Sequence, residues 1–115
     1  MLRGEIREVR LPPGLEGQDA RTRLALIVSN DGSNEAAGRH ERGMVVVVPV
    51  TTNVELELPF HIPLAPNDTG LDRDAKAQVE QMRSISVRRI GRLAGTVPEG
   101  RMAAIDAALR LHLAI

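Results

Sequence analysis

Arginine is the residue type in this sequence best suited to chemistry, because it supplies nearly all of the positive charge. Fourteen of the fifteen basic residues are arginine, and Lys76 is the single lysine. A guanidinium group is a planar fork that binds phosphate through two hydrogen bonds, whereas an ammonium group acts as a point charge. This usage favours a phosphate-bearing partner. GC-rich coding also enriches arginine, alanine and valine, so the composition leaves both explanations open.

The remaining residue types narrow the possible chemistry. The chain has no cysteine, which excludes disulfides and thiolate metal sites. The histidines, His40, His61 and His112, fit no metal-ligand spacing, so we expect surface positions for all three. Phe60 is the only aromatic residue, which argues against an RNA platform that works by base stacking. The formal net charge is zero, and we expect neither a metal nor another cofactor.

The length and composition predict one folded domain. The 115 residues, 43% of them hydrophobic, suffice for a single core, so residues 1–115 form one domain in this interpretation. No apolar run approaches the roughly 20 residues that cross a bilayer. The opening residues Met1–Glu5 are not followed by an apolar signal core. We therefore expect a cytoplasmic protein that does not interact with membranes.

The apolar pattern predicts several short strands. The strongest signal is Met44–Val50, which is apolar on both faces and therefore predicts a central strand. Pro63 predicts that the strand containing it lies at an edge or carries a bulge. The other predicted strands are Gly4–Arg10, Leu24–Val28, Phe60–Leu64, Ala75–Ile85 and Ile90–Val97.

Two helices are predicted among these strands. Capping side chains at Ser29–Asp31 favour a short helix up to Ala37, followed by a charged loop, Gly38–Gly43. Thr96 and Glu99 fit a capping box for a closing helix. The apolar face of that helix contains Met102, Ile105, Ala108, Leu109 and Leu113. Strands followed by one packed helix, without βαβ alternation, predict an α+β or mainly β class and a small barrel.

Several stretches, taken in order over nearly the whole chain, resemble the MazF/PemK (Kid) family of toxins from type II toxin–antitoxin systems. They are Arg3–Ile6 followed by a Pro/Gly loop, Arg23 before a strand ending at Ser29–Asp31, VVVPVTTN at 46–53, Gly70–Asp74 leading into QVEQMRSI at 78–85, Gly91–Leu93 and the amphipathic closing helix. Each stretch alone is weak, but the ordered set is specific.

The resemblance implies a twisted Src-homology-3-like barrel with a C-terminal helix, assembled as a homodimer. It implies a metal-independent endoribonuclease that cleaves single-stranded RNA, namely mRNA, at a short motif, through attack of a ribose 2′-hydroxyl on the adjacent phosphorus or a close variant. It also implies a cognate MazE-like antitoxin, a DNA-binding protein whose disordered acidic tail covers the toxin's groove. An acidic chain suits an arginine-lined site, because it mimics a phosphate backbone.

The resemblance implies three catalytic residues. Arg23 matches the family's catalytic arginine, and Thr51 matches its catalytic threonine. Glu80 lies where some members have a catalytic aspartate. An arginine can stabilise charge on the non-bridging oxygens and help protonate the leaving oxygen, and a threonine hydroxyl adds a fixed hydrogen bond. Glu80 is suited to accept the 2′-hydroxyl proton.

The expected substrate-binding residues are Gln81, Asn53, Glu16 and Asp19. Glu16 and Asp19 are rival equivalents of a Gly-x-Glu motif that the family carries before its arginine, and neither has the usual spacing. The chain also has Arg7 where the family usually has tryptophan, and Leu24 where it usually has proline. These departures cluster at the rim of the expected site and bear on substrate specificity.

Other interpretations of the same residues stay open. Without the family match, Arg23 is a solvated charge at a strand start, Thr51 forms a turn, and Glu80 and Gln81 lie on a strand's exposed face. Within the fold, the alternatives are a gyrase-targeting toxin and an inactive family member. Gyrase-targeting relatives depend on C-terminal residues that are often aromatic, whereas this chain ends Leu113-Ala114-Ile115. Because Arg23 and Thr51 are both present, catalysis is the favoured interpretation.

Overall fold

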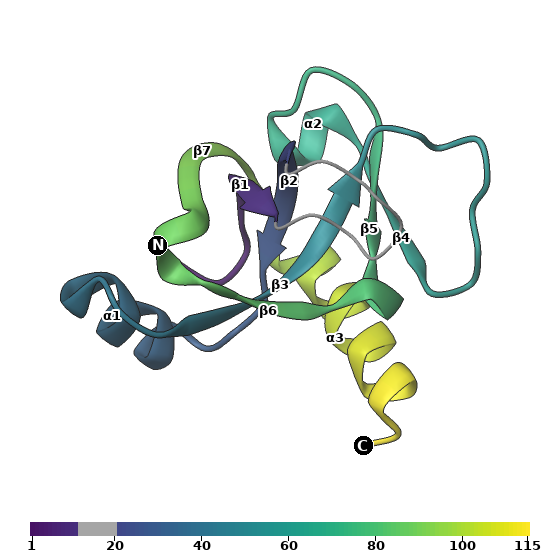
Figure 1. Ribbon diagram of the computed structural model, residues 1–115. Coiled ribbons are helices and arrows are strands. Elements are labelled where there is room, and N and C mark those ends of the chain that lie inside the picture. The colour runs from purple at the N-terminus through teal and green to yellow at the C-terminus, as the bar shows by residue number, and fades with distance from the viewer. Residues whose placement is uncertain (12–20) are drawn as a thin grey trace.

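One antiparallel sheet of seven strands organises the chain (Figure 1). The computed structural model describes residues 1–11 and 21–115. The strands are β1 (Glu5–Leu11), β2 (Arg21–Ile27), β3 (Met44–Thr51), β4 (His61–Leu64), β5 (Ala75–Gln78), β6 (Arg83–Ser86) and β7 (Ile90–Thr96). The helices are α1 (Asp31–His40), α2 (Pro66–Thr69) and α3 (Glu99–Leu113), and two 3-10 turns are η1 (Val79–Gln81) and η2 (Val87–Arg89).

The strand order is β4-β5-β3-β2-β1-β7, and β6 also pairs with β3. The predicted class, an α+β or mainly β fold with a C-terminal helix, is confirmed. Within the described ranges, β4 and β7 do not pair with each other, so the barrel expected from the sequence is open. The predicted edge position of the Pro63 strand is confirmed, because β4 ends the path. Helix α2 ends at its C-cap residue, Gly70, which adopts the left-handed conformation.

The predicted central strand is confirmed as β3. One edge of β3 pairs with β2, and its other edge pairs with β5 near Val50 and with β6 near Met44. Between β5 and β6 lies η1, so the prediction of one continuous strand over Ala75–Ile85 is wrong. Pro49 faces this interruption. The Val46 carbonyl points to the β2 edge, where it accepts from the Val28 N–H. Backbone groups alternate between the two edges of a strand, so the nitrogen of residue 49 points to the other edge. Proline has no N–H to pair there.

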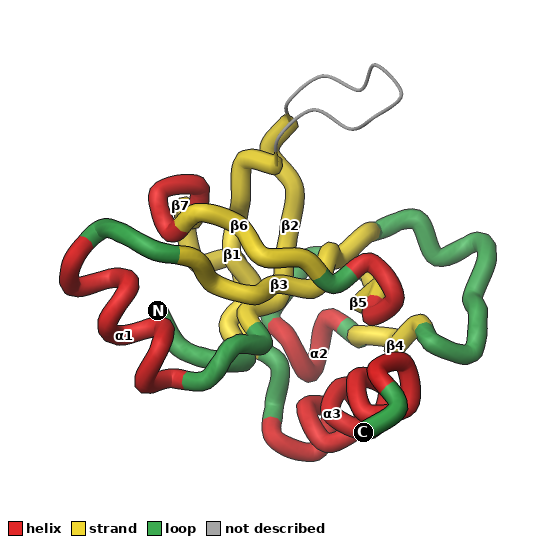
Figure 2. Tube along the Cα trace, turned by 60° about the horizontal axis from the view of Figure 1, so that its bottom comes forward, coloured by secondary structure: helices red, strands yellow, loops and turns green. Residues whose placement is uncertain are grey.

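Alternation along the strands builds one apolar cluster on each face of the sheet. On one face, Leu26 and Val48 pack with Met102 and Ile105 of α3. On the other face, Ile27 and Val47 belong to a second cluster that includes Ala37 of α1 and Val87 of η2. Figure 2 shows α1 beside the start of β3 and α3 beside β4, at separate places on the sheet.

The helix predictions are partly confirmed. The Asn30 side chain caps α1 by accepting from the Ser33 N–H at 2.8 Å, as its position before Asp31 predicted. Helix α1 extends through His40, so the loop predicted from Gly38 begins three residues too early. The capping box of α3 is wrong. Thr96 ends β7 and pairs with Glu5 in the sheet, and Pro98 is the N-cap without a side-chain hydrogen bond.

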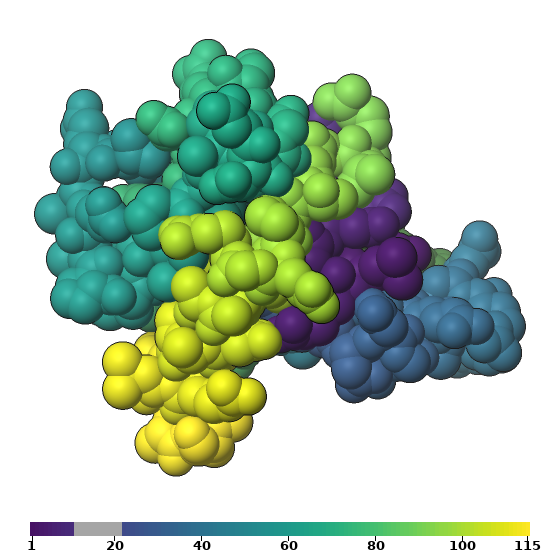
Figure 3. Space-filling model, turned by 180° about the vertical axis from the view of Figure 1, so that it is seen from behind, coloured from purple at the N-terminus to yellow at the C-terminus, as the bar shows by residue number. Residues whose placement is uncertain are grey.

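The apolar face of α3 is confirmed where the helix touches the sheet. Met102 and Ile105 are buried, whereas Leu113 is 45% exposed because the last turn extends beyond the rest of the molecule (Figure 3). In the described part of the chain, no helix is long and apolar enough to cross a membrane.

Candidate active site

The sheet register brings Arg23 and Thr51 together. The last β2–β3 pair is Leu24 with Val50, so the next position sets Arg23 opposite Thr51. On its other side Thr51 pairs with Lys76 of β5. Residues directly opposite each other in antiparallel strands project to the same face with their Cβ atoms about 5 Å apart. We call Arg23, Thr51 and Lys76 the polar row, and it lies on the face that α3 does not cover.

Arg23 lies at the exposed start of the polar row. Its side chain is exposed, and within residues 1–11 and 21–115 its guanidinium carries no ion pair. Arg3, Arg7 and Arg92 differ, since each forms an ion pair with an acidic side chain. The Arg23 fork can therefore bind an anion without first breaking an ion pair with a described carboxylate.

Thr51 is half-buried at the end of β3. Its Oγ1 accepts a hydrogen bond from the Asn53 N–H at 3.1 Å. A hydroxyl that accepts in this way keeps its own proton for donation. The tight turn thus fixes the oxygen while leaving a donor for a ligand. Asn53 itself is exposed, and its side-chain oxygen accepts from the Glu55 N–H at 3.3 Å.

The sequence analysis did not predict Lys76 as a site residue. Its side chain is buried, with 6% of the residue exposed, and its Nζ donates to the Leu56 carbonyl. The feature that could have indicated this role is that the chain's single lysine lies within a predicted strand. A buried ammonium beside Thr51 adds positive charge to the row and fastens the 52–60 loop to β5.

His61 and Glu80 form a second polar group. The His61 Nδ1 accepts from the Leu58 N–H at 3.1 Å, so the ring proton belongs on Nε2, which donates to Glu80 Oε2 at 3.2 Å. His61 is buried, so its predicted surface position is wrong. The other Glu80 oxygen, Oε1, is buried and has no hydrogen-bond partner among the described residues.

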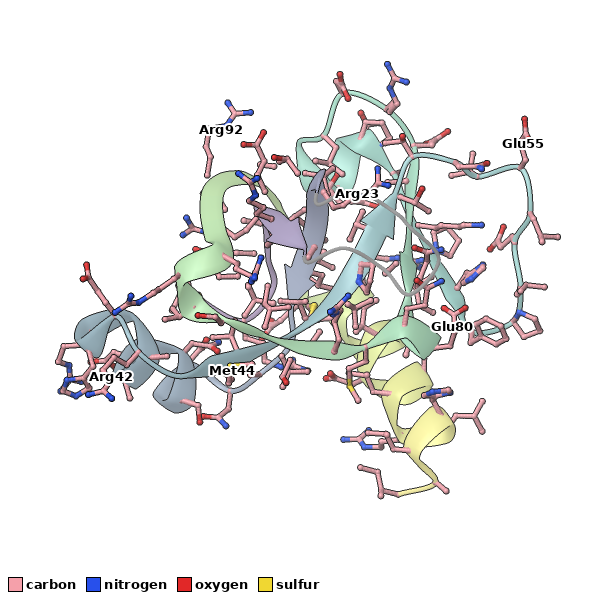
Figure 4. All side chains as sticks on the ribbon, viewed as in Figure 1. Arg23, Arg42, Met44, Glu55, Glu80 and Arg92 are labelled. Carbon is pink, nitrogen blue, oxygen red and sulfur yellow. The ribbon has the colours of Figure 1, made fainter. Side chains whose placement is uncertain are left out.

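The structure separates Glu80 from the polar row. Glu80 lies in η1, four residues after Lys76, and Figure 4 shows it beside α3, away from Arg23. The expected strand position of Glu80 and Gln81 is wrong because η1 interrupts the strand. Gln81 is exposed. Glu16 and Asp19 lie outside the described residues.

The two departures from the family pattern have clear positions. Arg7 is held by Glu5 Oε1 at 2.8 Å and by the Gly91 carbonyl at 3.1 Å. Leu24 packs against the cluster beneath α3, on the face opposite Arg23, which contradicts its expected place at the rim of the site.

The other two histidines, His40 and His112, are exposed. Among residues 1–11 and 21–115, no three histidine or acidic side chains group in a way that could hold a metal ion.

The arrangement suits phosphoryl transfer. A guanidinium, a hydroxyl donor and an ammonium in one row can bind the oxygens of a phosphodiester and stabilise charge that develops on them. A carboxylate with one oxygen held by histidine and the other unpartnered can accept a proton. Both groups lie on strands or turns whose backbone is fixed by the sheet.

Comparisons with known proteins agree over nearly the full length. A family model described as the PemK-like, MazF-like toxin of type II toxin-antitoxin systems matches residues 2–113. The chain is 45% identical to endoribonuclease MazF9 of Mycobacterium tuberculosis, over 98% of this chain and 96% of that protein. It is 25% identical to endoribonuclease EndoA of Bacillus subtilis, over 98% and 94%.

Solved structures share the fold. A MazF from Deinococcus radiodurans aligns with a TM-score of 0.77 at 20% identity, covering 100% of this chain and 97% of that chain. A mycobacterial endoribonuclease in complex with its cognate antitoxin aligns with a TM-score of 0.74 at 26% identity, covering 100% and 96%.

Proposed function

The chain belongs to the PemK-like, MazF-like toxin family of type II toxin–antitoxin systems, and from this premise we propose that it is an endoribonuclease that cleaves single-stranded RNA. Two relatives named as endoribonucleases each align with 98% of it. The observation that carries the proposal is the polar row, in which the β2–β3 register, continued one position past the Leu24–Val50 pair, sets a permanently charged arginine opposite a threonine. The proposed substrate is mRNA, cut at a short motif without a metal ion by a single toxin domain spanning residues 1–115.

The polar row binds the scissile phosphate in this proposal. Arg23 contacts two phosphate oxygens through its fork, Thr51 donates its hydroxyl proton, and Lys76 adds positive charge from within the sheet. The ribose 2′-oxygen forms a bond to the adjacent phosphorus, and the bond from phosphorus to the next nucleotide's 5′-oxygen breaks. Negative charge builds on the oxygens during this step. Donors fixed before the reaction stabilise that charge without reorganising.

Glu80 is the proposed acceptor of the 2′-hydroxyl proton. His61 holds Oε2, and the unpartnered Oε1 is the proposed proton acceptor. Because Oε1 is buried in this structure, the role requires RNA binding to uncover it. This role requires bound RNA to bring the 2′-hydroxyl within about 2.6–3.2 Å of Oε1. The RNA would then run from the polar row along β5 toward η1, with Gln81 at the exposed margin. Asn53 is a further proposed contact at the other side of the row, in the turn after β3. Glu16 and Asp19, which precede β2 in the sequence, are further proposed contacts.

The proposed assembly is a cytoplasmic homodimer that a cognate antitoxin neutralises. Among the similar structures, one mycobacterial endoribonuclease was solved with its cognate antitoxin, and a Deinococcus radiodurans MazF was solved with MazE. An acidic, flexible antitoxin segment can compete with RNA for the polar row, because its carboxylates present the same charge as phosphates.

Cleavage in the presence of a chelator tests the proposal. Purified, antitoxin-free protein is incubated with mixed-sequence RNA in excess EDTA, and the new ends are sequenced. We expect cuts at one short motif that are lost in Arg23→Ala and kept in Arg110→Ala, a matched change on exposed α3. No cut by folded wild-type protein would overturn the nuclease proposal and direct the work to a gyrase-inhibition assay.

A further inference from the structure

A cavity adjoins the polar row. It has a volume of about 310 Å³ and lies between the 52–60 loop and strands β4 and β5. Lys76 belongs both to the polar row and to the cavity wall, so the row and the cavity share this residue. An RNA strand whose phosphate is bound at the row can therefore place an adjoining base in the cavity.

The walls of the cavity combine apolar and acidic groups. Val54, Pro63 and Leu64 supply apolar surface, and Glu57 and Asp74 supply two carboxylates. Lys76 already donates to the Leu56 carbonyl, which fixes the loop that carries Glu57. Ionised carboxylates can only accept hydrogen bonds. The cavity thus suits a flat, partly apolar ligand whose edge donates hydrogen bonds.

We propose that this cavity binds a nucleobase with an exocyclic amino group, from the nucleotide beside the scissile phosphate; this inference rests on the proposed function. Cytosine, adenine and guanine each carry an exocyclic amino donor. Uracil has none, and its one edge donor, N3–H, lies between two carbonyl oxygens that carboxylates repel. At about 30 Å³ per water, the cavity has the volume of about ten waters, which is room for a nucleobase. The structure thus assigns Glu57 and Asp74 as specificity-determining residues that select against uracil at one position of the cleavage motif.

Cleavage of randomised RNA tests the selection. Wild type, Glu57→Gln and Asp74→Asn are given an RNA pool with random bases around the cut, and the products are sequenced. Each amide keeps the size of the side chain but loses its charge and gains a donor. We expect the wild type to disfavour uracil at one position, and each variant to reduce that discrimination by about 5- to 150-fold.

Matched controls separate the cavity from general charge effects. Glu55→Gln changes a neighbouring glutamate at the outer part of the same loop (Figure 4), and Asp72→Asn changes an aspartate whose side chain is 89% exposed. Neither residue lines the cavity, so both variants are expected to keep the wild-type preference. Unchanged discrimination in Glu57→Gln and Asp74→Asn, or an equal loss in the controls, would overturn the inference.

A binding measurement keeps this test independent of cleavage. Fluorescence anisotropy with 2′-O-methyl oligo(C), oligo(A) and oligo(U), which cannot undergo 2′-attack, reports base preference alone. We expect oligo(C) or oligo(A) to bind more tightly than oligo(U), with a smaller difference in Asp74→Asn. If the protein binds in this way but does not cut, the nuclease proposal fails and the cavity assignment stands. If it cuts but shows no such difference, the cavity assignment alone fails.

Discussion

The face of the sheet that α3 leaves uncovered has two ends of opposite character, although β2 and β3 build both. At one end, which we call the closed end, Ala25, Ile27, Val45 and Val47 are fully buried beneath α1 and η2. At the other end, the same two strands carry Arg23 and Thr51 of the polar row. Two residues along a strand advance it by only about 6.6 Å, so packing and ligand binding are separated by very little chain.

The difference shows how a small sheet can position reactive groups. The closed end contributes burial, which fixes the register of β2 against β3. Since a one-residue slip would turn every side chain to the opposite face, the buried valines and isoleucine also determine that Arg23 and Thr51 share a face. Arg23 can then stay exposed and bind a ligand without weakening the core.

The largest expected effect tests whether RNA cleavage needs Glu80 in addition to the polar row. Glu80→Gln removes the proposed proton acceptor but keeps the side-chain size, so we expect the cleavage rate to fall about 10²–10⁴-fold. RNA affinity should change little, because the amide still fills the same place beside His61. Single-turnover cleavage and binding of a motif RNA measure the two quantities. A rate within tenfold of wild type would show that the polar row acts without Glu80, and Glu99→Gln serves as the control.

The comparison between the two ends is sharpened within β2 itself. Ile27→Ala at the closed end should cost about 2–5 kcal/mol in free energy of unfolding, because it leaves a cavity in a fully buried cluster. Arg23→Ala should change that free energy by no more than about 0.5 kcal/mol, since the side chain is exposed. It should nevertheless lower the cleavage rate about 10²–10³-fold. Urea denaturation measures the stability of both variants, and a cleavage assay measures their rates. A variant that lost both stability and cleavage rate would contradict this separation of packing from catalysis.

A smaller effect is expected at Thr51. Thr51→Val keeps the shape but removes the hydroxyl, which should lower the cleavage rate by about 10- to 150-fold, the value of a hydrogen bond to a charged group. Thr51→Ser should retain most of the activity, because it keeps the donor. If Ser and Val behaved alike, the hydroxyl would not contact the phosphate and Thr51 would serve the turn at Asn53 only. Initial rates on one RNA substrate distinguish these outcomes.

The smallest expected effect concerns Glu5, the carboxylate that pairs with Arg7. Arg23 has no such partner among the described residues. Burial raises the pKa of Glu5. The hydrogen bond from the Leu2 N–H, together with the hydrogen bond and the charge of Arg7, lowers this pKa by more than burial raises it, so the net shift is downward. A depressed pKa stabilises the fold above the unfolded-state pKa, and this stabilisation is lost as pH falls through the folded-state pKa. Glu5→Gln should therefore be less stable than wild type at neutral pH by about 1 kcal/mol or less.

Urea denaturation of Glu5→Gln and wild type across pH checks this sign. The difference in unfolding free energy should shrink toward zero in acid. A difference that grew as pH fell would contradict the downward shift of the Glu5 pKa.

Much of the fold could be predicted from the sequence, because strand and helix periodicities are local. The apolar run of β3 and the buried face of α3 are visible in residues a few positions apart. The ordered family stretches also predict Arg23 and Thr51 as site residues. The capping box at Thr96 failed because pairing with Glu5, far away in the sequence, holds that residue in the sheet.

The sequence by itself determined most of the strands, the closing helix, the family and the two residues proposed to hold phosphate. Only the tertiary structure decided which side chains meet. Strand register sets Lys76 opposite Thr51, and the fold brings His61 to Glu80 across 19 residues of sequence. The burial of His61 and the interruption at η1 likewise depend on neighbours from other strands. Such contacts follow from how strands pair and pack, and that pairing depends on the whole sheet at once.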